Sequence, residues 1–136
     1  MVNMPHGQEI QDSFGVRSLL LRSILRLVRL TGLSVLKPDK FDLEMATRIN
    51  EGTQALITGF GKLKTVPASA SVDADVARKA ERRVEKAYRR AIAELFVGDD
   101  YINMFKRREI YRHLSNAADQ MAHCANKLHD IGVKMC

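Results

Sequence analysis

Two acidic residues lie one helical turn apart in the second half of the chain, at Glu81 and Glu85. Side chains four positions apart on a helix share one patch of surface, so these two carboxylates can approach the same cation. A second polar series follows at spacings of four, four and three: Ser115, Asp119, His123 and Asn126. Because metal sites in helical bundles use carboxylates and imidazoles from adjacent helices, this pattern raises the hypothesis of a metal site. The candidate ligands are Glu81, Glu85, Asp119 and His123.

The same acids have a plainer interpretation as part of a solvated charged face. Arg82, Lys86 and Arg89 all lie within about a turn of the acidic pair, and exposed ion pairs are ordinary features of helices. Spacing alone favours this interpretation over a ligand role. His113 and His129 have no consistent acidic partner at helical spacing and are expected at the surface.

The signatures of enzymes and of nucleic-acid binding are missing from the sequence. It has no Gly-rich phosphate loop, no nucleophile elbow, no paired-Cys metal site and no His-Glu-x-x-His motif. The net charge of +6 favours acidic or phosphate-bearing partners without selecting among them. The basic run from Lys106 to Arg108 could meet such a partner, although a solvated face is the favoured interpretation. We expect neither catalysis nor nucleic-acid binding.

A long helix over Asp100 to Cys136 must position Asp119 and His123. Apolar or small residues recur there at alternating steps of four and three, at Ile110, Leu114, Ala117, Met121, Cys124, Leu128, Ile131 and Met135. This spacing keeps one stripe facing a neighbouring helix, and no Pro interrupts it. Asp99 or Asp100 is suited to cap its start. We expect a helix of roughly 34 residues, about 50 Å long.

Two further helices are expected before it. One begins after Ser71 and stops near Gly98, with a stripe at Ala80, Val84, Ala87, Ala91 and Leu95. The other begins near Asp39 to Asp42, with a stripe at Ala46, Ile49, Thr53, Leu56, Phe60 and Leu63. Gly52, Gly59 and Gly61 are expected to weaken this helix and to let it fray after Phe60.

A first helix is expected from Glu9 to Leu30, after a flexible arm over residues 1–8. Its apolar surface is wide, and its narrow polar strip carries Arg22, Arg26 and Arg29. The surplus apolar face calls for a second subunit, a missing segment or a membrane-associated partner. Alternatively, the helix lies on an anionic membrane through its three arginines, or these form the solvated side of a bundle. The arginines are the candidate partner-binding residues.

These elements together predict one all-α domain over residues 1–136, an antiparallel four-helix bundle. A membrane span is not expected, because arginines interrupt the most apolar window, Val16 to Leu33. Cys124 and Cys136 do not make a disulfide framework, which favours a reducing, cytoplasmic setting.

The second half of the chain resembles the PhoU-like phosphate-transport regulators, in the branch found beside Pit-type phosphate permeases. The matching segments are Glu81-Arg-Arg-Val-Glu85, Ala91-Ile-Ala-Glu-Leu-Phe96, Arg107-Arg-Glu-Ile-Tyr111, Ala117-Ala-Asp119 and Ala125-Asn-Lys-Leu128. The resemblance runs from about Asp75 to Lys134, and full-length members of the family have about six helices. It implies a shortened, all-helical PhoU-like chain.

The resemblance also implies metal binding, because the family binds metal clusters through acidic residues four apart. Its acidic pairs fall on Glu81 and Glu85, and on Ser115 and Asp119, with a further ligand at His123. Ser115 departs from this pattern, since a hydroxyl replaces the carboxylate. The first helix has Arg22 and apolar neighbours where the family has an acid-rich stretch, so at most half of the family's metal site is expected.

The sequence leaves three alternative hypotheses for the function of this chain. The favoured one is a non-enzymatic regulatory or adaptor protein, linked to phosphate transport and contacting a permease or a signalling protein, with a homodimer expected. A divalent or iron-type metal ion would then modulate the contact. The second is a metal-dependent catalyst or metal store using the four candidate ligands. The third is a basic peripheral membrane protein.

Overall fold

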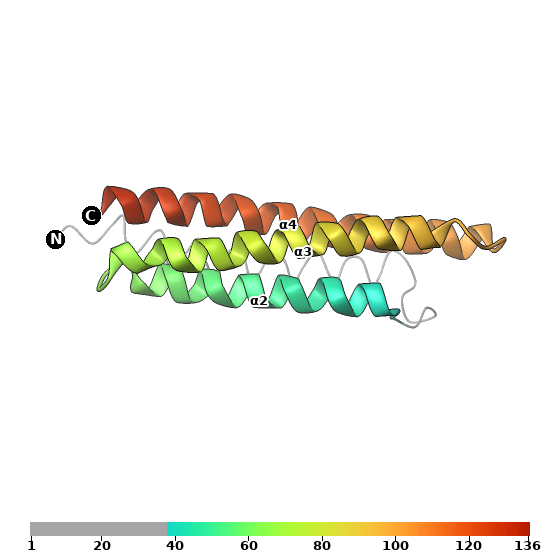
Figure 1. The fold of residues 1–136 in the computed structure, drawn as a ribbon, viewed down its shortest axis with the longest axis horizontal. Helices are drawn as coiled ribbons and strands as arrows, with labels where there is room; N and C mark the ends of the chain where they lie inside the picture. Colours follow the sequence, from blue (N-terminus) through green and yellow to red (C-terminus); the bar gives the residue numbers. More distant parts are fainter. Residues whose placement is uncertain (1–37) are drawn as a thin grey trace.

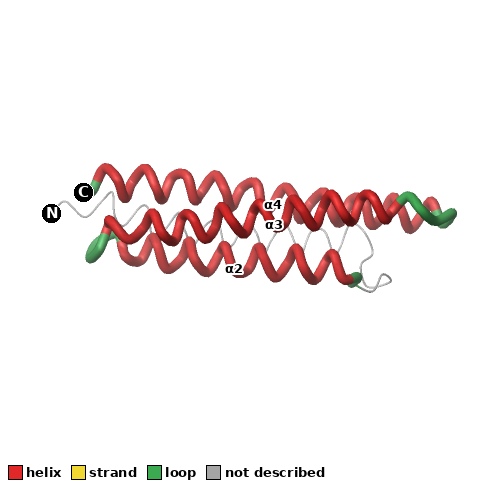
Figure 2. The backbone as a smooth tube through the Cα atoms, viewed as in Figure 1, coloured by secondary structure: helices red, strands yellow, loops and turns green. Residues whose placement is uncertain are grey.

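The computed structural model describes residues 38–136, which form three antiparallel α-helices (Figure 1). Their bounds are α2, Lys40–Lys62; α3, Ala70–Leu95; and α4, Tyr101–Lys134, with a short 3-10 turn, Pro67–Ser69, between α2 and α3. Figure 2 shows helix throughout this part of the chain apart from short connections. The all-helical class is confirmed for the described residues. The expected first helix, the arm over residues 1–8, and Arg22, Arg26 and Arg29 lie outside them.

Helix α2 begins where the sequence predicted, because Asp39 and Asp42 form a reciprocal capping box. The Asp42 N–H donates to Asp39 Oδ1 at 2.8 Å, and the Asp39 N–H donates to Asp42 Oδ2 at 3.0 Å. These bonds satisfy amide groups that the start of a helix otherwise leaves unpaired. The helix continues to Lys62, two residues beyond the expected onset of fraying, because Phe60 and Leu63 are buried in the core.

One position of the α2 stripe is wrong. Ala46 is exposed, whereas Met45 is completely buried. The other five predicted positions, Ile49, Thr53, Leu56, Phe60 and Leu63, are buried. Met45 fits the same face because it precedes Ile49 by four residues, which is one helical turn.

Helix α3 presents an almost continuous row of buried alanines to its neighbours. Ala70, Ala74, Ala77, Ala80, Ala87 and Ala91 are each at most 3% exposed. Small side chains let α2 and α4 pack close to the α3 backbone, and both helices contact α3 extensively. The helix starts at Ala70, slightly before the expected position, and ends at Leu95, three residues before Gly98.

Helix α4 confirms the predicted long element, with 34 residues from Tyr101 to Lys134. Asp100 caps it, accepting a hydrogen bond from the Asn103 N–H. Five positions of its predicted seam are buried, namely Ile110, Leu114, Ala117, Met121 and Leu128. The remaining three, Cys124, Ile131 and Met135, are partly buried against the core.

The core consists of two clusters along the bundle. The first cluster surrounds the start of α2 and includes Phe41, Met45, Val84, Ile110 and Tyr111. The second lies toward the ends of α2 and α4 and includes Leu56, Phe60, Leu63, Met121 and Leu128. Within residues 38–136, no helix combines the length and the apolar character needed to cross a bilayer.

Candidate functional site

The predicted acidic patch is partly assembled where α3 and α4 pack together. Glu81 is half-buried on α3, and burial, followed by the negative charges of Glu85 and Asp119, raises its pKa above the ordinary value. The Arg78 Nε group donates to Asn126 Oδ1 at 3.0 Å and joins the same faces of the two helices. Glu81 is therefore influenced by the charges of two other candidate ligands, Glu85 on the same helix and Asp119 on α4.

The rest of the patch faces solvent. His123 and Asp119 are exposed, and Glu85 Oε1 accepts a hydrogen bond from Arg89 Nη2 at 2.8 Å. Among the described residues, no group of three or more His, Cys, Asp or Glu side chains has the arrangement that would hold a metal ion. In this arrangement the patch is an acidic surface on which one carboxyl group, that of Glu81, has a raised pKa, and the metal site stays a prediction.

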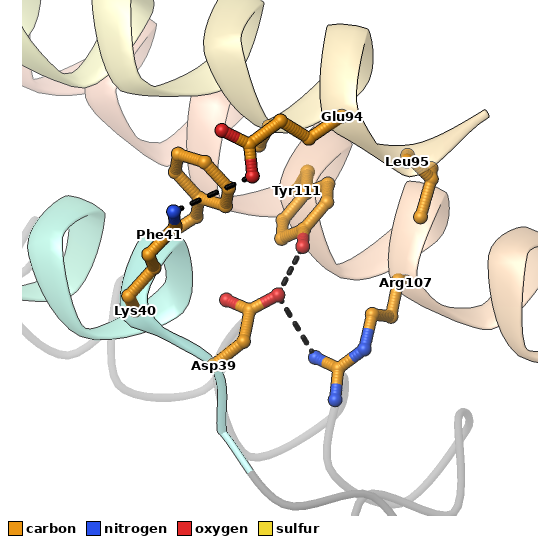
Figure 3. Close-up of a pocket in the computed structure, with 8 residues that line it drawn as sticks. Asp39, Lys40, Phe41, Glu94, Leu95, Arg107 and Tyr111 are labelled. Atoms are coloured by element: carbon orange, nitrogen blue, oxygen red, sulfur yellow. Dashed lines mark hydrogen bonds and ion pairs between the residues drawn. The ribbon is translucent and has the colours of Figure 1, made fainter. Parts of the chain in front are cut away.

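A second candidate site lies at one end of the bundle, where α2 begins, α3 ends and α4 runs past both (Figure 3). It is a cleft of about 480 Å³. The floor is apolar, with Phe41, Ala91 and Leu95, and the charged or polar lining consists of Asp39, Lys40, Glu94, Arg107 and Tyr111. Lys40 and Glu94 pair at 3.4 Å on the exposed rim. This combination of an apolar floor and a polar rim is typical of small-ligand sites.

A hydrogen-bonded network fills the wall of this cleft. Arg107 Nη1 donates to Asp39 Oδ2 at 3.1 Å and to Asp42 Oδ2 at 3.3 Å, and the Tyr111 hydroxyl also donates to Asp39 (Figure 3). Burial, reinforced by the hydrogen bond to Asp39 and the two nearby carboxylates, raises the pKa of Tyr111, so its hydroxyl stays a donor at neutral pH. Asp39 thereby caps α2 and ties it to α4.

Asp42 completes the network from a buried position. It is 8% exposed, and burial raises its pKa despite the hydrogen bond from the Asp39 amide and the charge of Arg107. Its Oδ1 atom is buried without a hydrogen-bond partner in the described part of the chain. The charged and polar groups of the network form hydrogen bonds and ion pairs with one another. The clearest role of the network is therefore to hold this end of the bundle together.

The sequence did not reveal this network. The sequence indicates Asp39 only as part of a helix start. It favours a solvated face for Arg107, and this prediction is wrong because the Arg107 side chain is only 22% exposed. The available signal was local: Arg107 and Tyr111 lie one turn apart, on the same face of the predicted helix. Their partners lie 68 and 72 residues away, and spacing carries no information about such pairs.

Comparisons of this chain with protein-family models, with curated proteins and with solved structures find no match.

Proposed function

We propose that this chain is a non-enzymatic regulatory or adaptor protein of the PhoU-like kind, linked to inorganic phosphate transport. It acts in the cytoplasm through its helix surfaces on a Pit-type permease or a signalling protein. The proposal includes the finer fold, the antiparallel four-helix bundle expected from the sequence. Its support is the resemblance along α3 and α4, together with the helical architecture of residues 38–136.

One observation carries the proposal further than the resemblance alone. The residues that match the family's acidic positions, Glu81, Glu85 and Asp119, come from two helices and lie close enough for Glu85 and Asp119 to raise the pKa of Glu81. A cation would relieve this repulsion, because opposite charge favours the ionised carboxylate. We therefore propose that a divalent or iron-type metal ion modulates the partner contact through this patch, with His123 rotating in from solvent.

Phosphate uptake tests the proposed function directly. The chain is expressed with the Pit-type permease of the same organism in a bacterial host that lacks its own phosphate transporters. We expect the rate of labelled phosphate uptake to change by about twofold or more when the chain is present, since regulators act through modest coupling energies. Unchanged uptake, together with no association between the chain and the detergent-solubilised permease, would reject the proposal.

The metal component has its own test and matched control. Elemental mass spectrometry measures metal in untagged protein and in the triple variant Glu81→Ala, Glu85→Ala, Asp119→Ala. The control triple variant is Glu51→Ala, Glu109→Ala, Asp130→Ala, which removes the same charge from other surface positions. Stoichiometric metal that only the first variant loses supports a metal-modulated regulator. Metal absent from the unmodified protein removes the metal component.

A further inference from the structure

The tip of the α3–α4 hairpin exposes a concentrated apolar surface. The hairpin extends beyond the start of α2, so the turn after α3 and the first turn of α4 lack the third helix beside them (Figure 1). Five large apolar side chains there are at least 60% exposed: Phe96, Val97, Tyr101, Ile102 and Phe105. We call these five residues the tip patch. Contiguous exposed apolar groups of this kind mark interaction surfaces.

The area of the tip patch suits a protein interface. Aromatic side chains offer roughly 150 to 250 Å² each and aliphatic ones somewhat less. Because the five residues are between 60% and 84% exposed, the patch presents on the order of 600 Å² per chain. Two copies facing each other would bury on the order of 1,200 Å², which reaches the lower range of specific, stable interfaces. A small hollow of about 50 Å³ lies within the patch, lined by Phe96, Tyr101, Met104, Phe105 and Arg108. It has room for the end of one aliphatic side chain.

The charges around the tip patch are complementary to a second copy in the opposite orientation. Asp99 and Asp100 precede the apolar residues of α4, and Arg108 follows them. All three are exposed. Asp100 and Arg108 are separated by about 12 Å of helix. If a two-fold axis passes beside Met104, Arg108 of each copy faces the acidic turn of the other, as a self-complementary isologous interface requires.

We propose that the tip patch is a homodimer interface, in which two hairpin tips overlap antiparallel. Val97 or Ile102 of each copy fills the hollow of the other, and Arg108 pairs with Asp99 or Asp100 across the interface. An anionic lipid surface fits the tip less well, because the two aspartates of the turn would meet it first. This interface is independent of the proposed link to phosphate transport.

Sedimentation velocity over about 5 to 500 micromolar full-length chain tests the proposal, because dimerisation depends on concentration. We expect a transition from one to two chains per particle. Phe105→Glu should raise the dimer dissociation constant at least about tenfold, as removal of a central aromatic anchor does. Val133→Glu is the control, since Val133 is 60% exposed on the same helix at the opposite end, and it should leave the constant unchanged. Circular dichroism checks that both variants keep their helicity.

Charge reversal identifies the orientation. Arg108→Asp and Asp99→Arg should each weaken the dimer, and the chain carrying both changes should recover it, since both cross-interface pairs are then restored with opposite sign. Asp99 is used because Asp100 caps α4. A chain that stays monomeric throughout would overturn the proposal, as would a dimer unaffected by Phe105→Glu and by Arg108→Asp. Binding of a monomeric chain to phosphatidylserine-containing vesicles would also overturn it and would assign the tip to a lipid surface.

Discussion

At Glu81, burial and the neighbouring negative charges both raise the pKa of the carboxyl group. Burial disfavours its ionised form, and Glu85 and Asp119 disfavour it further, so its pKa is raised in the folded state. The folded chain therefore holds this proton more tightly than the unfolded chain. As pH rises from the ordinary glutamate pKa through the raised value, the ionisation of Glu81 lowers the free energy of unfolding.

Glu81→Gln should accordingly stabilise the protein at pH 7, because the amide removes the unfavourable charge. Glu81 is partly solvated, and screening keeps the expected gain to about 0.5 kcal/mol or less. The gain should vanish at about pH 3, well below the ordinary glutamate pKa, because the carboxyl group is then protonated in both the folded and the unfolded state. Urea unfolding at the two pH values measures it. Glu51→Gln, which removes an exposed acid paired with Arg48 at 3.0 Å, should give no such gain, and destabilisation by Glu81→Gln at pH 7 would contradict the argument.

At the scale of the element, α2 shows why a glycine inside a helix is not always a weak point. Helix propensity alone predicts that Gly52, Gly59 and Gly61 each lower the stability of the helix by a similar amount. In the bundle, a Cβ atom at Gly59 would lie 2.5 Å from Leu128 Cδ2 and 2.8 Å from Asp73 Cβ, whereas one at Gly61 would meet nothing within 4 Å. Gly59 therefore permits close packing of α2 against both other helices, and only Gly61 is a simple propensity cost.

The two glycines provide a matched pair of variants, two residues apart on one helix. Gly59→Ala should destabilise the protein by about 1 to 3 kcal/mol, because the new methyl group overpacks a buried contact. Gly61→Ala should stabilise it by about 0.5 to 1 kcal/mol through helix propensity. Thermal and urea unfolding give both values. Equal effects of the two substitutions would mean that the close contact at Gly59 has no energetic weight.

At the scale of the whole molecule, the alanine row of α3 determines how closely the three helices pack. Ala77 is completely buried in the second core cluster, between α2 and α4. Beside the first core cluster, Asp39 accepts hydrogen bonds from Arg107 and Tyr111, and these bonds join the start of α2 to α4. The close packing along α3 and the hydrogen bonds between the start of α2 and α4 both hold the three described helices against one another.

Ala77→Leu should disturb the packing of the three helices. The larger side chain must push apart helices that approach closely because the residues between them are small. We expect a loss of about 1 to 3 kcal/mol or more in the free energy of unfolding. Ala93→Leu, at an exposed position of the same helix, should change it by no more than about 0.5 kcal/mol. Urea unfolding followed by helicity compares the two. A tolerated leucine at position 77 would show that the bundle accommodates wider spacing.

The sequence by itself determined the helices of the described region, because the information for them is local. The alternating spacing of α4, the aspartates at the helix starts and the turn around Pro67 depend on residues a few positions apart. Local spacing also explains why the sequence predicts Ala46 to be buried where Met45 is buried instead. Both residues lie near the edge of the apolar stripe, and the angle at which the helices pack decides which of them is covered.

Tertiary structure decided everything that joins residues distant in the chain. It brought Asp39 to Arg107 and Tyr111, placed Gly59 against Leu128, and left Phe96 and Phe105 exposed beyond the start of α2. It also set Glu81 beside Asp119 while leaving His123 in solvent. Helical periodicity specifies which face of a helix is apolar, but the neighbour that each turn meets depends on helix lengths, axial offsets and side-chain volumes, which only the packed bundle defines.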